Sequence, residues 1–173
     1  MGMVVMKTVS ILLTRYVDAF GKFICLMRKK KFSHASISID GNEEIFYSFN
    51  YKGLAIEKPK KYFPKLRASD GLMMRFQVTL DVYNKIKSYI DEFLNKKGSL
   101  NYSQLGVILC ILHIPYKFKN SYFCSQFITE ILYKSGAVKL KKSTTLYLPS
   151  DIIDGLEFNF SPPEIENFNF GVA

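Results

Sequence analysis

The stretch that most constrains this chain is 121–136, which predicts one amphipathic helix. Its apolar residues recur at helical spacing, namely Phe123, Phe127, Ile128, Ile131 and Leu132. Glu130 and Lys134 form an i,i+4 pair on the other side. Gly136 suits the left-handed residue that commonly ends a helix. The stretch therefore predicts a helix with one face buried in the domain.

A cysteine, Cys124, lies in the first turn of this predicted helix, for which Asn120 or Ser121 is the expected cap. Unpaired backbone N–H groups and the positive end of the helix dipole favour a thiolate there, so the position suits a nucleophile. The same cysteine shares a face with Phe127 and Ile128. Free cysteines are among the most often buried residue types. The helix alone leaves both a reactive and a packing role open.

The composition is that of one folded domain. The chain has 173 residues, of which 48% are apolar, and this is enough to bury a sizeable core. The three cysteines, Cys25, Cys110 and Cys124, form no even disulfide set, and no signal peptide or membrane-spanning stretch is recognisable. We therefore expect a reducing, cytoplasmic location. A net charge of +9 permits an acidic partner, whether anionic lipid, nucleic acid or an acidic substrate.

Periodicity along the chain predicts an α+β domain with an antiparallel sheet flanked by helices. Strands are expected at 4–13 and 72–80, a hairpin at 32–50 around the turn Asp40-Gly-Asn, and helices at 16–27, 81–97 and 104–112. The Lys- and Pro-rich stretch 53–67 predicts a surface loop. Residues 138–148 should be extended, and 149–151 should form a short helical turn. The domain is expected to span 1–156, followed by a poorly ordered tail over 157–173.

Only two histidines are available as a base for a reactive cysteine. His113 ends an apolar helix just before Ile-Pro, which favours a structural role. His34 begins a strand, a rigid place from which an imidazole can point at the start of a packed helix. The common metal and phosphate motifs are missing from the sequence, so we expect no cofactor. The basic runs follow no known nucleic-acid-binding pattern, which argues against specific nucleic-acid recognition.

Two pairs of segments together resemble a known family. The first is Phe32-Ser-His-Ala-Ser-Ile-Ser-Ile-Asp40 followed by Tyr47-Ser-Phe49, and the second is Tyr122-Phe-Cys-Ser-Gln-Phe-Ile128 followed by Leu148-Pro-Ser-Asp151. In order, spacing and local sequence they resemble the circularly permuted branch of the NlpC/P60 papain-like superfamily. This branch includes the YiiX-like proteins and is related to the lecithin retinol acyltransferase-like proteins. Its histidine strand precedes its cysteine helix, the reverse of papain order.

The resemblance covers roughly 4–154 and implies a permuted papain-like fold with Cys124 as the nucleophile and His34 as the base. The orienting residue of the family lies on the strand after the histidine strand, where Ser48 is the best-placed polar residue. Many members have a carboxylate, an amide or a second imidazole at this position. Asn50 and Glu57 are the alternatives.

These parts imply a thiol hydrolase that cleaves an amide or ester bond through an acyl-enzyme, with the Cys124 backbone N–H holding the oxyanion. The expected substrate contains an amide or ester and is acidic or lipid-linked, with contact to a membrane surface. An acyltransferase using the same pair would need an apolar groove, for which 47–51 and 116–123 are candidates. A binding module with a vestigial site would act through the basic clusters. The sequence leaves the oligomeric state open.

Overall fold

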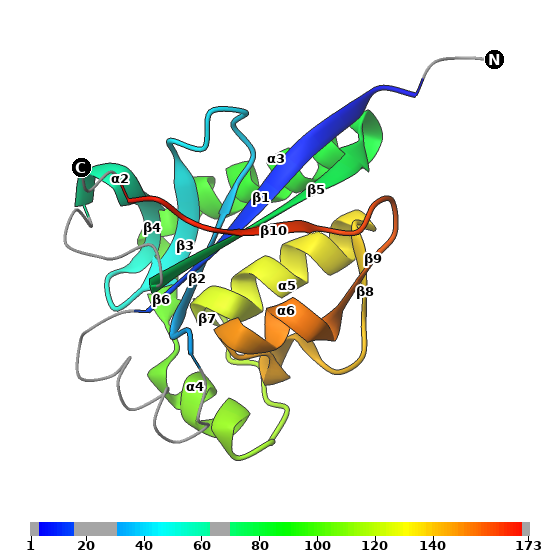
Figure 1. Cartoon of the computed structure of the whole chain (residues 1–173). Coiled ribbons are helices and arrows are strands. Elements are labelled where there is room, and N and C mark those ends of the chain that lie inside the picture. The colour runs from blue at the N-terminus through cyan, green and yellow to red at the C-terminus, as the bar shows by residue number, and fades with distance from the viewer. Residues whose placement is uncertain (1–3, 16–30, 63–69, 171–173) are drawn as a thin grey trace.

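The computed structural model describes residues 4–15, 31–62 and 70–170, and an antiparallel sheet of six strands dominates it (Figure 1). The strand order is β10-β5-β1-β2-β3-β4. The strands are β1 (Met6–Thr14), β2 (His34–Ser38), β3 (Phe46–Asn50), β4 (Gly53–Glu57), β5 (Gly71–Thr79) and β10 (Glu164–Asn167). Two small sheets pair β6 (Asn101–Tyr102) with β7 (Ser121–Tyr122), and β8 (Val138–Leu140) with β9 (Leu156–Phe158).

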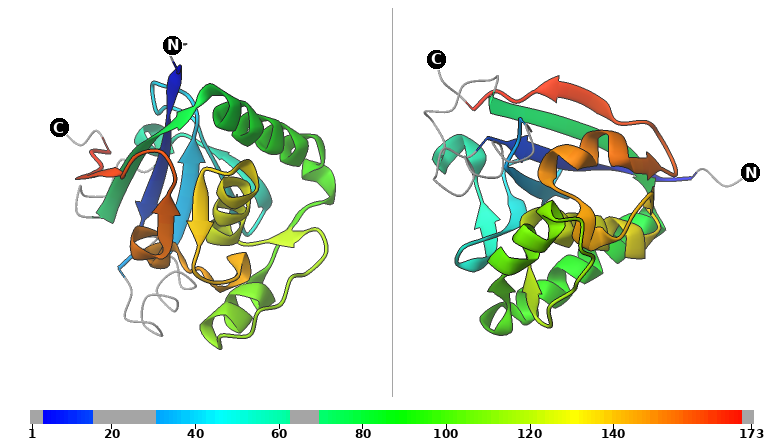
Figure 2. Two further views of the ribbon diagram at one scale, coloured as in Figure 1. Left: turned by 90° about the vertical axis from the view of Figure 1, so that its right-hand side faces the viewer. Right: turned by 90° about the horizontal axis from the view of Figure 1, so that it is seen from below.

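The helices among the described residues are α2 (Pro59–Tyr62), α3 (Leu80–Asn95), α4 (Gln104–Ile111), α5 (Cys124–Ser135) and α6 (Ile152–Gly155). The α3 and α5 helices pack together on one face of the sheet (Figure 2). In the part of the chain that the structure describes, no helix is long and apolar enough to cross a membrane. The α+β prediction of an antiparallel sheet flanked by helices is confirmed.

The β1 strand sits between β2 and β5 and sends side chains into two apolar clusters. Val9, Ile11 and Leu13 alternate into the main core, whereas Leu12 points into a smaller cluster on the other face. Thr14 pairs with His34, so the end of β1 lies beside the start of β2. The β-branched, apolar run that predicted a buried strand here is therefore the pattern of a strand covered on both faces.

Aromatic rings join α3 and α5 to the sheet. The ring of Phe127 on α5 lies 5.2 Å from that of Phe49 on β3 and 4.9 Å from that of Phe93 on α3, measured between centroids. The contact with Phe93 is edge-to-face, the geometry that the ring quadrupole favours. Because Phe127 is fully buried, its transfer from water contributes roughly 1.5–3 kcal/mol to stability. These rings fix α5 against the strands that carry the site described below.

The prediction of a surface loop over 53–67 is wrong in its first part. Residues 53–57 form β4, which pairs with β3 in a hairpin whose tight turn brings Gly53 opposite Asn50. The Asn50 side chain accepts a hydrogen bond from the Lys52 backbone N–H, and Gly53 has a φ of +91°, which glycine adopts without strain. Leu54 is buried against the main core. The lysines and prolines that suggested a loop begin only after this strand.

The prediction of a poorly ordered tail over 157–173 is also wrong for its described residues. The β9 strand pairs with β8, and β10 forms the edge of the main sheet beside β5. Phe168 and Phe170 are buried against Leu12, Phe46 and Met73 on the face opposite α5. Described residues beyond the predicted boundary at 156 thus belong to the domain, because their aromatic side chains complete its second core.

Most of the other predicted elements are confirmed within a residue or two, including the 32–50 hairpin and the helical turn at Pro149–Asp151. In 138–148 only Val138–Leu140 is a strand, and a 3-10 turn at Thr144–Leu146 follows. The helix predicted over 16–27 lies outside the described residues.

Candidate active site

Cys124 is the first residue of α5. Its helix follows Phe123, whose backbone is extended, and no side chain caps this end. The predicted caps, Asn120 and Ser121, are wrong, because both residues precede the helix by several positions and Ser121 belongs to β7. Gly136 ends the helix with a φ of +82°, as predicted. Backbone N–H groups in the first turn of a helix have no partners within it, so Cys124 sits among donors that favour negative charge.

The start of α5 is fixed from two sides. Phe123 is buried with Val107, Cys110 and Leu148 between α4 and the 147–151 segment. The Ser125 hydroxyl, next to the cysteine, donates a 2.6 Å hydrogen bond to the backbone oxygen of Tyr147. Both contacts hold Cys124 on a rigid element, and rigidity is what a reactive side chain requires.

His34 links two other side chains of the site. Its Nε2 atom lies 2.9 Å and 3.1 Å from the two carboxylate oxygens of Glu57, the last residue of β4. The Cys124 side chain acts on the same imidazole, and its interaction with the ring helps to raise the His34 pKa. All three residues are buried, with exposed fractions between 3% and 5%. The order of contact is therefore thiol, imidazole, carboxylate.

The charges of this group favour a protonated imidazole. Burial lowers the pKa of His34, but the negative charge of Glu57 and hydrogen bonds to Cys124 and Glu57 outweigh it. The result is a pKa raised from 6.5 to about 10. At neutral pH the imidazole thus carries a proton between the carboxylate and the thiol. A proton held there can be delivered to a leaving group at the cysteine.

Ser48 does not orient His34 in this structure, which corrects the prediction. Its hydroxyl is fully buried and donates a 2.5 Å hydrogen bond to the backbone oxygen of Ala35 on the neighbouring strand. Of the two alternatives, Asn50 accepts from Lys52 in the hairpin turn and Glu57 binds the imidazole. The strand after β3, rather than β3 itself, carries the carboxylate.

The remaining histidine and cysteines lie apart from this arrangement or outside the described residues. His113 is exposed just after α4, with a φ of +60°. Cys110 is buried in the cluster around Phe123, and Cys25 falls outside the part of the chain that the structure describes. Within residues 4–15, 31–62 and 70–170, no group of three His, Cys, Asp or Glu side chains is arranged to hold a metal ion.

A serine on the 147–151 segment ties the two halves of the site together. Ser150 Oγ accepts a 3.0 Å hydrogen bond from the backbone N–H of Phe32, two residues before His34, and lies 3.3 Å from the Phe32 oxygen. The same segment receives the Ser125 hydroxyl at Tyr147. It therefore bridges the start of β2 and the start of α5. Ser150 belongs to the sequence motif Leu148-Pro-Ser-Asp151, but the sequence alone suggested no role for it.

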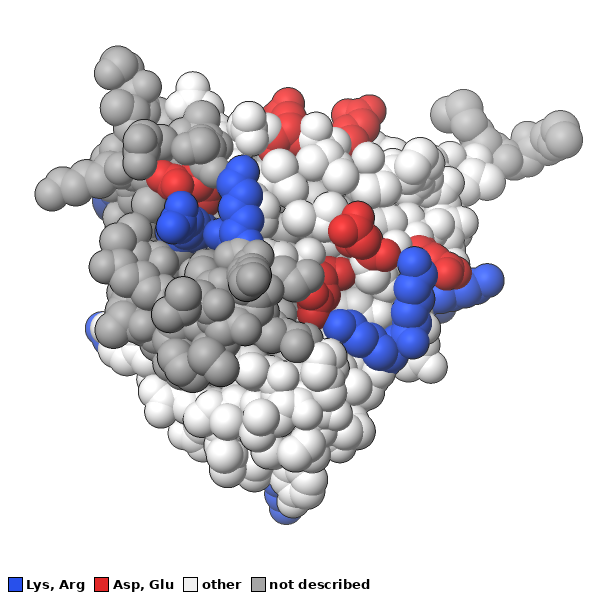
Figure 3. All heavy atoms as spheres, turned by 60° about the horizontal axis from the view of Figure 1, so that its bottom comes forward, with Lys and Arg blue, Asp and Glu red and all other residues white. Residues whose placement is uncertain are grey.

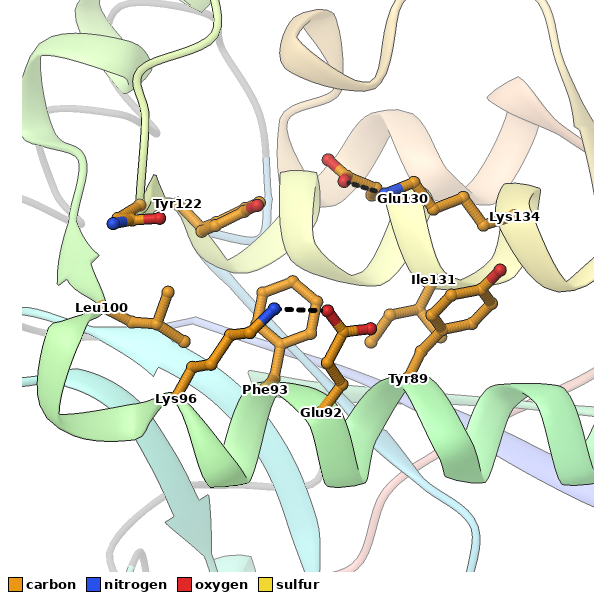
Figure 4. Close-up of a pocket in the computed structure, with 10 residues that line it drawn as sticks. Tyr89, Glu92, Phe93, Lys96, Leu100, Tyr122, Glu130, Ile131 and Lys134 are labelled. Carbon is orange, nitrogen blue, oxygen red and sulfur yellow. Dashed lines mark hydrogen bonds and ion pairs between the residues drawn. The ribbon is translucent and has the colours of Figure 1, made fainter.

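A hollow of about 100 Å³ lies between α3 and α5 (Figure 4). Its walls include Tyr89, Phe93 and Tyr122, and its charged groups are paired, Lys96 with Glu92 and Lys134 with Glu130. Neither Cys124 nor His34 nor Glu57 lines it. Its charges are neutralised locally, so it offers no group for chemistry on its own.

No protein-family model matches this chain, and no curated protein matches it either. The interpretation of the site therefore depends on its geometry and on its residues.

Proposed function

We propose that this chain is a thiol hydrolase that cleaves an amide or ester bond, with Cys124 as nucleophile, His34 as acid and base, and Glu57 as the residue that orients and charges His34. We further propose that its fold is the circularly permuted NlpC/P60 papain-like one. The order of elements supports this, since the β2 strand with the histidine precedes the α5 helix with the cysteine. Free Cys110 and Cys124 fit a reducing compartment such as the cytoplasm.

One observation carries the proposal: a single buried imidazole is hydrogen-bonded to a carboxylate and interacts with a cysteine at a helix start. A thiol is activated when it lies next to a base and a third group orients that base. A vestigial binding module was an alternative because Ser48 would orient His34 only weakly. A carboxylate at the imidazole removes that reason.

The reaction follows from where the proton resides. His34 holds the proton of the thiol, and the Cys124 thiolate attacks the carbonyl carbon while the backbone N–H groups at the start of α5 stabilise the oxyanion. The tetrahedral intermediate then expels the amine or alcohol, which takes the proton from His34. Water gives a proton to the neutral imidazole and attacks the thioester. Loss of the thiolate releases the acid and restores the starting state.

The test is hydrolysis of an activated ester, p-nitrophenyl acetate, combined with intact mass and peptide mapping. We expect a burst of nitrophenol and one acyl group on Cys124, both lost in Cys124→Ala. Cys110→Ala is the matched control, because it removes the other buried thiol within the described residues and should retain the burst. Acylation that persists in Cys124→Ala, or no acylation of the wild type, would refute the proposal.

Product analysis then separates hydrolysis from acyl transfer. A hydrolase forms free acid at the same rate with or without an added amine or lysolipid acceptor. An acyltransferase diverts the acyl group to the acceptor and forms little acid.

A further inference from the structure

The α4 helix and the turn after it expose large apolar side chains on one surface. The exposed fractions are 54% for Leu105, 41% for Ile108, 60% for Leu112, 48% for Ile114 and 54% for Tyr116. We call these five residues the α4 apolar surface. They fall within twelve consecutive residues, whereas most other exposed apolar side chains are scattered over the chain. A cluster of this kind marks an interaction site more often than a random surface does.

The other side of α4 already has its partners. Gly106, Val107 and Cys110 are buried against Phe123 and Leu148. Leu105, Ile108 and Leu112 are spaced three and four apart, so they line a different stripe of the same helix. The exposed stripe is therefore additional to what packing of α4 requires, and its apolar character calls for a partner outside the domain.

The charge around the surface indicates the chemistry of that partner. Between Glu92 and Glu130 the sequence contains no Asp or Glu, but it contains four lysines, Lys96, Lys97, Lys117 and Lys119. In Figure 3 the lower part of the visible face, where α4 lies in Figure 1, is almost entirely uncharged. Lys96 is paired with Glu92 and Lys117 with Glu130, which leaves Lys97 and Lys119 as the exposed cations of this stretch. An apolar patch accompanied by such lysines matches the boundary between acyl chains and anionic headgroups. Tyr116 has the apolar ring and polar tip that are favoured at this boundary.

We propose that the α4 apolar surface docks this protein onto an anionic lipid surface, with its apolar side chains inserted at the headgroup boundary. The docking does not depend on the chemistry at Cys124. Phe123, adjacent to Cys124, packs directly against α4. The side of α4 opposite the docked surface therefore contacts the start of α5.

Vesicle sedimentation tests the docking with the full chain. We expect binding to phosphatidylcholine vesicles that contain phosphatidylserine and little binding to phosphatidylcholine alone. Leu105→Ser and Leu112→Ser should each weaken binding roughly fivefold, because each half-exposed leucine still has apolar area to bury. Lys119→Gln should weaken it about fivefold, the effect of one cation near an anionic surface.

Matched controls are exposed residues far from α4. Ile165→Ser on β10 and Tyr133→Ser on α5 remove apolar side chains of similar exposure, and Lys139→Gln on β8 removes an equivalent charge. All three should bind vesicles like the wild type. Cys124→Ala should also bind normally, so a failure of catalysis and a failure of docking give different results.

Two outcomes would overturn the proposal. One is vesicle binding that the leucine variants leave unchanged. The other is the absence of vesicle binding together with self-association that Leu105→Ser and Leu112→Ser abolish, which would assign the α4 apolar surface to a second copy of the chain.

Discussion

Replacing Glu57 by Gln removes one charge from the site, and with it the charge-assisted hydrogen bond to His34, while keeping a side chain of the same shape. The carboxylate is the strongest of the contributions that raise the His34 pKa to about 10. Without it, burial is opposed by Cys124 alone, so the His34 pKa falls. We therefore expect His34 to be protonated at pH 7 in the wild type and to have a clearly lower pKa in Glu57→Gln.

The same change has a signed effect on stability. A folded-state pKa above the unfolded value stabilises the fold fully below about pH 6.5, and this stabilisation is lost as pH rises through about 10. Loss of a hydrogen bond to a charged group costs roughly 1.5–3 kcal/mol. The variant does not have to keep an unpaired, buried imidazolium, because the imidazole can release its proton. Glu57→Gln should therefore be less stable by roughly 2 kcal/mol at pH 6, with the gap closing toward pH 10.

The assay is NMR titration of the His34 imidazole together with thermal unfolding from pH 6 to 10. For a chain of this size, roughly 2 kcal/mol corresponds to a fall in Tm of about 4–8 °C. Glu130→Gln is the matched control, since Glu130 is equally buried but pairs with Lys117 and Lys134. It should leave the His34 pKa unchanged. A His34 pKa that is the same in Glu57→Gln and wild type would refute the assigned role of Glu57.

Three further substitutions test the other parts of the site. His34→Ala should reduce turnover by roughly a hundredfold to ten-thousandfold with an unchanged circular dichroism spectrum, whereas His113→Ala should remain active, and full activity of His34→Ala would contradict the mechanism. Ser48→Ala should cost roughly 1 kcal/mol in urea unfolding, for the bond to Ala35, with turnover changed less than threefold. Ser150→Ala should lower turnover by roughly tenfold or more, because it removes the hydrogen bond to Phe32 that holds the start of β2. An unchanged kcat together with lower stability would show that this serine has only a structural role.

The sequence predicted those parts of the site that local patterns encode. The apolar spacing of 121–136 gave the helix, and the alternation of 34–39 gave the strand that begins at His34. Cys124 therefore fell at a helix start even though the predicted caps were wrong. Phe123, the residue before the helix, makes no side-chain cap and is instead buried against α4. Burial by a distant element leaves no capping signal in the local sequence.

The contact of His34 with Glu57 was not predicted because it depends on strand pairing. Glu57 was among the alternatives, but the Lys- and Pro-rich composition that follows it hid the short strand Gly53–Glu57. A strand of five residues carries little periodicity of its own. The burial of Phe168 and Phe170 was missed for a similar reason, since two prolines and several asparagines suggested a tail there and its apolar partners lie on β1, β3 and β5.

The central claim is that Cys124 is an activated thiol beside His34, and the most direct measurement is the order in which the cysteines react. Brief treatment of the folded protein with limiting iodoacetamide at neutral pH, followed by peptide mapping, reports the alkylation of Cys25, Cys110 and Cys124 separately. We predict that Cys124 is alkylated first, and that His34→Ala slows its alkylation by about tenfold or more, since the thiolate is the reactive form. Preferential labelling of Cys25 or Cys110, or a Cys124 rate that His34→Ala leaves unchanged, would contradict the account.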